Sequence, residues 1–359
     1  MFEEKLTFSF ATTQEIIRKV GRIDAFRGQW NAIERKNNRY LRELKRIATI
    51  ESIGSSTRIE GAVLTNDEVE KLIRKVQITS FHSRDEQEVV GYFEALDLIL
   101  DHASDIDLTE AYLGQLHGIL LRHSDKDQRH RGHYKRLSNQ VVAHYPDGSQ
   151  RVIFQPTAPH LTGKEVQELL AWVRTQLEQQ HLHPLVIIGT FVYEFLSIHP
   201  FQDGNGRLSR LLTTLLLLRT GYEFAQYVSF ENVVESRKVE YFRVLMAGQQ
   251  HRGTPQEVIG EWMLFFLDCL EMLVLRLEAK YTLARERGGY LNERQRQLLD
   301  ALRQNQPAKI GDLARRLTEV SVNTLKKDLR YLHEQGVLEK IGERKATAYR
   351  VRPGEIEKS

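Results

Sequence analysis

The sequence contains very little cysteine: of its 359 residues only one, Cys269, is a cysteine. A single cysteine allows no disulfide within one chain, a composition that suits a reducing cytosol. Cys269 stands in an apolar helical run, so we interpret it as a small buried hydrophobic residue rather than a nucleophile. The amino end, MFEEKLTFSF, lacks the basic and long apolar regions of a signal peptide. These features predict a cytoplasmic protein.

Long hydrophobic runs and a strong net charge are missing as well. The longest apolar run, LLTTLLLL, is far shorter than the roughly 20 residues of a membrane helix, so we expect no membrane partner. The formal net charge of +3 is too small to argue for nucleic acid by itself. Only 8 residues are proline, which permits long helices along most of the chain.

Helical spacing of apolar residues dominates the chain and predicts a mainly α fold. The ranges expected to be helical are 14–50, 86–101, 109–122, 162–180, 184–198, 205–219, 233–250 and 256–286. An exception lies at 141–154, where two short β-rich runs flank the hairpin signal PDGSQ. We therefore expect an N-terminal helical region over 1–85 and a helical core with a small β-hairpin over 86–285. A boundary follows at Gly288 and Gly289.

The segment 290–359 has a pattern of its own. Three helical runs, NERQRQLLDALRQ, AKIGDLARRL and VNTLKKDLRYLHEQG, precede two β-rich runs, the order of a winged helix-turn-helix domain. The segment holds 15 Lys and Arg against 10 Asp and Glu. Side chains that suit phosphates and base edges are expected on the exposed face of the third helix: Asn323, Thr324, Lys326, Lys327 and Arg330. Winged helices also bind proteins, so DNA, contacted through 309–331, and a protein both stay open as partners.

The stretch HPFQDGNGRLSR, residues 199–210, stands directly before a strongly apolar helical run. Gly204, Asn205 and Gly206 open the helix predicted over 205–219. The free backbone N–H groups at a helix start, together with the helix dipole, form an anion pocket. Glycine lets a phosphate approach the backbone closely. The stretch therefore predicts a phosphate site.

Four charged or titratable side chains give this anion site its chemistry. Arg207 and Arg210 lie three residues apart, so they are neighbours on the helix and suit a polyphosphate. Asp203 would repel phosphates unless Mg²⁺ lay between them, and Mg²⁺ takes one or two carboxylates together with phosphate oxygens. His199, with an ordinary pKa of about 6.5, suits taking a proton from a hydroxyl near neutral pH. Together they predict nucleotide transfer.

The same stretch resembles the signature of the Fic family, H-x-F-x-[D/E]-G-N-G-R-x-x-R, and every fixed position matches. The resemblance implies transfer of AMP from ATP to a Ser, Thr or Tyr hydroxyl of a protein, including the chain itself. It makes His199 the general base and Asp203 the ligand of Mg²⁺. It places Arg207 on the β-phosphate side and Arg210 at the γ-phosphate. The nucleotide-binding segment that it implies is Asp203, Gly204, Asn205, Gly206, Arg207, Leu208, Ser209 and Arg210.

The resemblance also assigns roles outside the signature. The hairpin at 141–154 takes the place of the family's flap, where a segment of the target protein docks by main-chain hydrogen bonds. Tyr241 stands where relatives carry a tyrosine near the adenine. The intact GNGR run argues against the kinase-like relatives, which alter the glycine loop, whereas phosphocholine transfer stays open. The long apolar helices leave room for a homodimer.

A second stretch, STRIEG at 56–61, resembles the inhibitory motif [S/T]-x-x-x-E-[G/N] of many Fic proteins. Ser56 and Glu60 are four residues apart and would share a helix face, and Gly61 completes the motif. The resemblance implies that Glu60 pairs with Arg210. ATP would then lose the partner of its γ-phosphate and could not be attacked in line. We therefore expect an autoinhibited enzyme that Glu60→Gly activates.

Two alternatives to AMP transfer stay open. One is the removal of AMP from a modified protein, in which Glu60 orients a water molecule. The other is a DNA-binding regulator whose Fic core senses a nucleotide. The intact His199, Asp203 and arginine pair speak against the second, because each is dispensable for mere binding.

Overall fold

The computed structural model describes residues 2–34, 38–74, 81, 83–139, 141–144, 150–286, 293–318, 320–334, 336–342 and 347–352. Over these residues the protein is mainly helical, as the sequence predicts. The chain forms two compact units, Met1–Leu275 and Arg276–Ser359. The expected separation of an N-terminal region from a catalytic core near residue 85 stays a prediction. None of the helices in the described ranges is long and apolar enough to cross a membrane.

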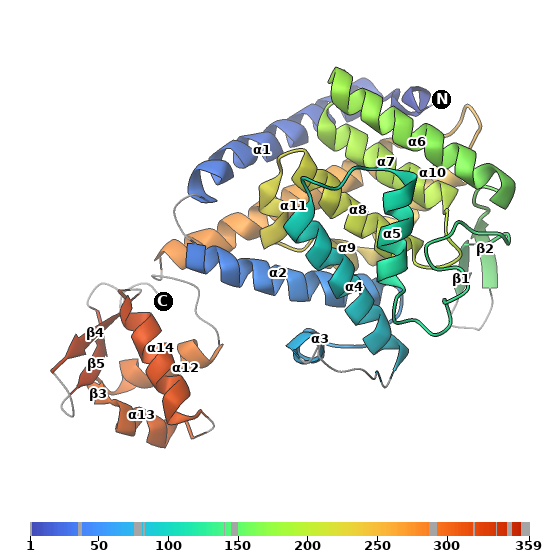
Figure 1. Ribbon diagram of the computed structural model, residues 1–359. Helices are drawn as coiled ribbons and strands as arrows, with labels where there is room; N and C mark the ends of the chain where they lie inside the picture. Colours follow the sequence, from blue (N-terminus) through green and yellow to red (C-terminus); the bar gives the residue numbers. More distant parts are fainter. Residues whose placement is uncertain are drawn as a thin grey trace. The chain divides into compact units, whose positions relative to one another are not determined.

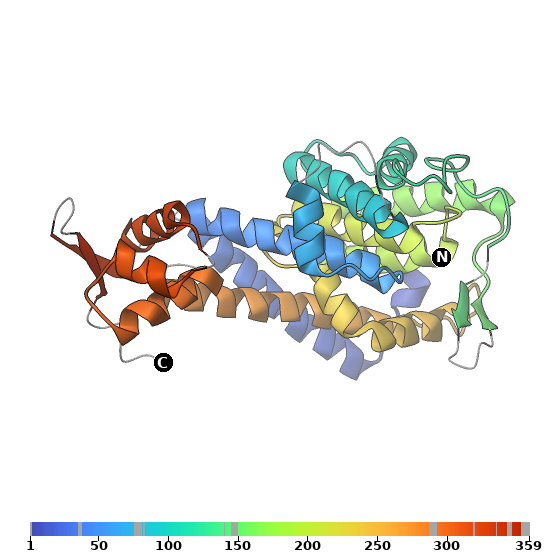
Figure 2. The ribbon, with the colours of Figure 1, turned by 90° about the horizontal axis from the view of Figure 1, so that it is seen from below.

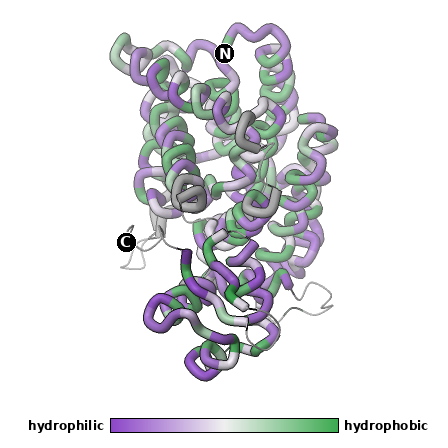
Figure 3. Tube along the Cα trace, turned by 90° about the vertical axis from the view of Figure 1, so that its left-hand side faces the viewer, coloured by the Kyte–Doolittle hydropathy of each residue, from purple (hydrophilic) through white to green (hydrophobic). Residues whose placement is uncertain are grey.

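The described residues of the first unit form helices and a β-hairpin (Figure 1). Its elements are η1 (Glu3–Leu6), α1 (Phe10–Glu34), α2 (Asn38–Ile59), α3 (Asn66–Arg74), α4 (Arg84–His102), α5 (Glu110–Leu120), β1 (Val141–His144), β2 (Gln150–Phe154), α6 (Pro159–Gln179), α7 (Pro184–Ile198), α8 (Asn205–Arg219), η2 (Glu223–Tyr227), α9 (Phe230–Ser236), α10 (Lys238–Gln249) and α11 (Gly260–Glu286), which continues into the second unit. Figure 3 shows hydrophobic and hydrophilic residues mixed along most helices, as expected of amphipathic helices around a core.

The helical pair α7 and α8 lies in the middle of the first unit (Figure 1). Every residue of α7 after Pro184 is buried, and so are Leu211–Leu218 of α8, because both runs are mainly apolar. Helices α2, α4, α5 and α9 pack against α8, and α6 packs against α7. A helical pair buried on all sides is a rigid support for the loop 199–204 that joins its two members.

The two strands of the hairpin predicted over 141–154 are confirmed, whereas its turn at 145–149 lies outside the described residues. Strands β1 and β2 pair antiparallel from His144 opposite Gln150 to Val141 opposite Phe154, with an irregularity between Val141 and Val142. The hairpin lies at one end of the first unit in both ribbon views (Figure 1 and Figure 2). Its strand β2 contacts α10.

The second unit contains the three helices and the two-stranded wing that the sequence predicts. Its elements after α11 are α12 (Glu293–Gln304), β3 (Ala308–Lys309), α13 (Ile310–Arg316), α14 (Val322–Glu334), β4 (Leu338–Ile341) and β5 (Ala348–Val351). The short strand β3 was not predicted, and it joins an antiparallel sheet of order β3-β5-β4. The unit has its own core, which includes Leu298, Leu302, Leu313, Leu325, Leu329, Leu332, Val337, Leu338 and Val351.

Two details of the predicted helices were wrong. The helix expected over 233–250 is two helices, because Arg237 leaves helical geometry with φ −120° and ψ 28°. Helix α2 also runs beyond the range predicted over 14–50, and Gly54 lies inside it. A Cβ atom there would lie 2.6 Å from both Arg58 Nη1 and Asn66 Oδ1, so glycine serves close packing rather than a turn.

Candidate functional site

The loop between α7 and α8 turns at two residues in the left-handed region. His199 ends α7 with φ 52°, and Gly204 precedes α8 with φ 79°. The N–H groups of Asn205, Gly206 and Arg207 have no intrahelical acceptor because they open the helix, and Gly204 has no side chain to cap them. With the helix dipole they are the donors that an anion would need, and the anion site itself stays a prediction.

The side chain of Asn205 closes this loop. Its Oδ1 accepts a hydrogen bond from Phe201 N at 2.9 Å, and its Nδ2 donates to Phe201 O at 2.8 Å. Asn139 Nδ2 donates to the same carbonyl at 3.1 Å. The side chain of Asn205 therefore holds the loop, and its backbone N–H is the part left for an anion.

His117 on α5 is a second support of the loop that the sequence did not reveal. Its Nδ1 accepts a hydrogen bond from Gly132 N at 2.8 Å, so its Nε2 carries the proton and donates to Asp203 O at 3.0 Å. Its ring stacks on Phe201, with centroids 3.9 Å apart. Burial lowers the pKa of His117 to about 4, which keeps this neutral form at physiological pH.

Arg207 reaches inward from the first turn of α8. Its Nη1 lies 3.1 Å from Glu88 Oε2, and its Nη2 lies 3.3 Å from Asp203 Oδ1. Glu88, nearly buried on α4, also accepts a hydrogen bond from Arg84 Nε at 2.7 Å. The Nε of Arg207 is buried and has no hydrogen-bond partner among the described residues. Such an unused donor suits a further acceptor, for which a phosphate oxygen qualifies.

Asp203 offers a carboxylate beside this anion site. Its Oδ1 accepts a hydrogen bond from Gly204 N at 2.6 Å, and its Oδ2 lies 3.1 Å from Lys126 Nζ. Burial would raise the pKa of Asp203, but the positive charges of Arg207 and Lys126 outweigh it and lower the pKa to about 2. Within the described ranges no three His, Cys, Asp or Glu side chains form a metal-binding group. One ionised carboxylate next to a phosphate site is nevertheless a donor set that fits Mg²⁺ bound together with phosphate.

Arg210 is bound by Ser56 and Glu60, the two residues of the STRIEG motif that were expected to share a helix face. Its Nη2 donates to Glu60 Oε1 at 2.7 Å and to Ser56 O at 3.0 Å, and its Nε donates to Ser56 Oγ at 2.8 Å. Burial would raise the pKa of Glu60, but the charge and hydrogen bond of Arg210 outweigh it and hold the pKa below its ordinary value. The contact that the resemblance implies between Glu60 and Arg210 is therefore present.

Glu60 also fills space at the anion site. A Cβ atom on Gly206 would clash with Glu60 Oε1 and would lie 3.3 Å from Arg210 Nη1. The carboxylate thus occupies the open side of Gly206, where the missing side chain would let an anion approach. An anion and this carboxylate cannot share the position, because like charges repel.

Gly61 explains how the chain places Glu60 there. Helix α2 ends in a Schellman motif in which Gly61 N bonds Arg58 O and Ala62 N bonds Thr57 O, both at 3.1 Å. Glu60 is then the C-cap residue, and Gly61, with φ 108°, adopts the left-handed conformation that glycine favours. The glycine of the motif therefore turns the chain directly after the carboxylate.

His199 is partly buried at the start of the loop. Its Nδ1 lies 3.4 Å from Leu196 O. Burial, together with the charge of Lys135, lowers the pKa of His199 to about 4. Lys135 donates to Ile198 O at 3.0 Å, which fixes its ammonium group near the end of α7. His199 is therefore neutral at pH 7, the form that can accept a proton.

The other predicted site residues are buried. Leu208 and Ser209 face the core, and Ser209 Oγ donates to Gly206 O at 2.7 Å, so only their backbone can meet a ligand. Tyr241 on α10 packs against Trp262, with ring centroids 5.8 Å apart. Burial raises the pKa of Tyr241 to about 12, and the charge of nearby Arg210 acts against this rise. A contact of Tyr241 with adenine stays a prediction.

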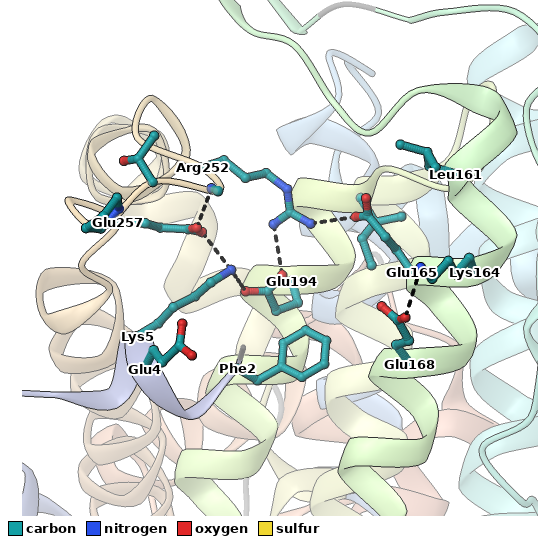
Figure 4. Close-up of a pocket in the computed structure, with 14 residues that line it drawn as sticks. Phe2, Glu4, Lys5, Leu161, Lys164, Glu165, Glu168, Glu194, Arg252 and Glu257 are labelled. Carbon is teal, nitrogen blue, oxygen red and sulfur yellow. Dashed lines mark hydrogen bonds and ion pairs between the residues drawn. The ribbon is translucent and has the colours of Figure 1, made fainter.

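Helix α7 also lines a separate cavity of about 770 Å³, which none of the predicted site residues borders (Figure 4). Lys5 Nζ lies there between Glu194 Oε1, at 2.5 Å, and Glu257 Oε1, at 2.9 Å. Arg252 joins Glu194, at 2.8 Å, to Glu165, at 3.0 Å. This network connects the amino-terminal segment to the helix that ends at the loop.

Sequence reasoning missed Glu88, His117 and Lys135. Glu88 stands four residues after Arg84, which looks like an ordinary surface pair on a helix. His117 and Lys135 are single polar residues whose spacing to the signature carries no pattern. Their roles come from tertiary packing, so no signal in one sequence could have found them.

Comparison with known protein families defines the class of protein to which this helical core and its loop belong. The sequence model of the Fic/DOC family matches residues 107–217, and that of the DeoR-like helix-turn-helix domain matches 294–342. The chain therefore contains a Fic domain and a C-terminal DeoR-like helix-turn-helix domain. The Fic match includes 199–210, whereas 56–61 lies outside it.

Individual relatives agree with this class. The protein adenylyltransferase Fic of Drosophila melanogaster is 30% identical over 207 residues, which are 57% of this chain and 39% of that protein. The chain thus spans about two fifths of the length of the curated relatives it matches. The crystal structure of a Fic family protein from Desulfovibrio desulfuricans G20 covers 97% of both chains, with a TM-score of 0.63 and 25% identity. A Fic domain containing signaling protein from Bacteroides thetaiotaomicron shares the fold over 71% of this chain and 94% of its own, with a TM-score of 0.59 and 23% identity.

Proposed function

We propose that this chain transfers AMP from ATP to a hydroxyl group of a protein, itself included, and that Glu60 keeps it inhibited. The observation that carries the proposal is the position of the Glu60 carboxylate. It lies 2.7 Å from Arg210 and on the open side of Gly206, where a terminal phosphate would bind. The relatives named protein adenylyltransferase support the reaction.

The reaction follows from the groups around the loop. The target hydroxyl oxygen attacks the α-phosphorus of ATP, the bond to the β-phosphate oxygen breaks, and pyrophosphate leaves. His199, neutral at pH 7, accepts the hydroxyl proton. The N–H groups at the start of α8 and the side chain of Arg207 bind the phosphates. Mg²⁺, when held by Asp203, would neutralise phosphate charge. The hairpin 141–154 would dock the target segment as an added strand.

Glu60 would inhibit this reaction by charge and by volume. While its carboxylate is on Arg210, the γ-phosphate has no guanidinium to bind and meets a negative charge instead. ATP bound without that contact would not align its α-phosphorus with the incoming hydroxyl. Removal of the carboxylate would free Arg210 and restore the productive position.

The test is incubation of three proteins with Mg²⁺ and α-labelled ATP, followed by a denaturing gel. We expect label on Glu60→Gly, little on the wild type, and none on Glu60→Gly/His199→Ala. Equal labelling of the wild type and Glu60→Gly would contradict the inhibitory role of Glu60. Labelling that survives His199→Ala would remove the role of this histidine as the base.

The reverse reaction is the alternative in the same site. Glu60 could orient a water molecule that removes AMP from a modified protein. Incubation of the wild type with an AMP-modified protein separates the two reactions, because release of AMP would favour removal and retention of label would favour transfer.

A second candidate function is DNA binding by the second unit. The match to the DeoR-like domain supports it, as do the side chains along α14. Asn323, Lys326, Lys327 and Arg330 are exposed there, whereas Thr324 is half-buried beside Ser321. We propose that α14 contacts DNA phosphates and bases. Retardation of DNA fragments that weakens steeply with salt would support this role, and no retardation at low salt would refute it.

A further inference from the structure

The guanidinium of Arg58, in the last turn of α2, donates a hydrogen bond from each of its five N–H groups. Two of them bind both carboxylate oxygens of Glu235 on α9, at 2.6 and 2.9 Å. The others go to Leu64 O at 2.9 Å, Asn66 Oδ1 at 3.1 Å and Ser55 Oγ at 3.2 Å. One side chain thus joins the end of α2, the segment that follows it, and α9.

These contacts enclose the turn that carries Glu60. Arg58 precedes Glu60 by two residues, and Leu64 follows it by four. Residues four apart share a helix face, whereas residues two apart point to different sides. Ser56 and Glu60 therefore reach Arg210, while Arg58 reaches α9. The side chain of Glu60 keeps 36% of its surface exposed, so burial alone does not fix the carboxylate.

We propose that Arg58 is a positioning residue for the inhibition: through Glu235 it fixes the turn to α9 and keeps the Glu60 carboxylate on Arg210. This inference rests on the proposed function, because it concerns how Glu60 blocks the site. Burial would raise the pKa of Glu235, but the hydrogen bonds from Arg58 hold it below its ordinary value, so the pair is ionised at neutral pH. A bidentate pair between two charged groups is the strongest contact that this turn makes with α9.

Arg58→Ala is the first test. We expect AMP incorporation from labelled ATP to rise about tenfold above the wild type and to stay below Glu60→Gly, because the turn loses charge-assisted hydrogen bonds while the carboxylate remains. Arg46→Ala is the matched control, since Arg46 lies on the same helix and pairs with Glu43 and Glu70 instead. It should stay within about twofold of the wild type.

The combination with Glu60→Gly distinguishes positioning from a general effect on structure. In that background Arg58→Ala should add no further activity, because no carboxylate remains to be positioned. A further rise in the double variant would overturn the proposal. So would an unchanged activity of Arg58→Ala in an experiment in which Glu60→Gly is active.

ATP affinity gives a readout that does not depend on transfer. Glu235→Gln keeps the shape of the side chain and removes its charge. By calorimetry it should bind ATP several-fold more tightly than the wild type, since Glu60 competes less for Arg210. An unchanged or weaker affinity would refute the positioning role of Arg58. This test does not depend on whether Arg58→Ala folds. If Glu60→Gly transfers no AMP, the proposed function fails, and this affinity still tests the inference about Arg58.

Discussion

Replacement of Glu60 by glutamine should lower the stability of the free protein and increase the stabilisation that ATP provides. Arg210 has 2% of its side chain exposed, and its charge is met by the Glu60 carboxylate at 2.7 Å; Ser56 supplies only neutral acceptors. Removal of one partner from a buried ion pair costs about 3–5 kcal/mol. Because 36% of the Glu60 side chain is exposed, solvent screening reduces the cost here to about 1–2 kcal/mol.

Thermal unfolding of the wild type and Glu60→Gln, without and with ATP, measures both effects. Each kcal/mol lost should lower the Tm by about 2–4 °C in a domain of this size. Saturating ATP should then close or reverse the gap, because each tenfold gain in affinity adds about 1.4 kcal/mol of stability. Glu70→Gln is the control. It removes a carboxylate from a pair with Arg46 and Arg74 on the surface, and it should change stability by less than about 1 kcal/mol without altering the effect of ATP.

The pH dependence of this difference has a definite sign. The pKa of Glu60 is lowered in the folded protein, so its stabilising effect is present above the ordinary value of 4.5 and is lost as the pH falls through the lowered pKa. The gap in Tm between wild type and Glu60→Gln should therefore shrink in acid. Equal stability of the two proteins at pH 7, with equal effects of ATP, would refute the reasoning.

Three further predictions concern the base, the turn and the support of α7. Since the pKa of His199 is about 4, AMP transfer by an activated variant should keep its rate from pH 8 to pH 5, and a fall centred near pH 6.5 would contradict this. Gly61→Ala places a side chain at φ 108°, so it should destabilise the turn by about 1 kcal/mol and raise AMP incorporation a few-fold. An unchanged rate would contradict the role of this turn in placing Glu60. Lys5→Met leaves the buried carboxylates of Glu194 and Glu257 with one partner fewer, so the free energy of unfolding measured in urea should fall by about 3 kcal/mol. A fall of less than about 1 kcal/mol would contradict this.

The sequence allowed the central helices to be predicted with the bounds that the structure has. Pro184 marks the start of α7, and the glycines around Asn205 mark the start of α8, because their backbone preferences are local. The break at Arg237 and the continuation of α2 through Gly54 were not predicted. At Gly54 the glycine serves close packing against Arg58 and Asn66, which no local pattern indicates. Local chemistry can be predicted from one sequence, whereas close approach between distant segments cannot.

In the candidate site, too, features of consecutive residues could be predicted, whereas contacts between distant segments could not. The anion site at the start of α8 depends on consecutive residues and could be predicted. The pairing of Glu60 with Arg210 joins segments 150 residues apart, and only the family resemblance indicated it. His117 and Glu88, which hold Asp203 and Arg207, gave no signal because each acts through a fold that one sequence does not reveal. The roles of these residues in catalysis and inhibition stay predictions.

The most direct measurement compares two labelled forms of ATP on Glu60→Gly in the presence of Mg²⁺. If the site transfers AMP, α-labelled ATP should label the protein, γ-labelled ATP should not, and the wild type should take up little of either. Label from the γ-phosphate would indicate phosphoryl transfer and contradict the assignment of the reaction. No label from either form on the protein or on added candidate targets would contradict AMP transfer by this loop.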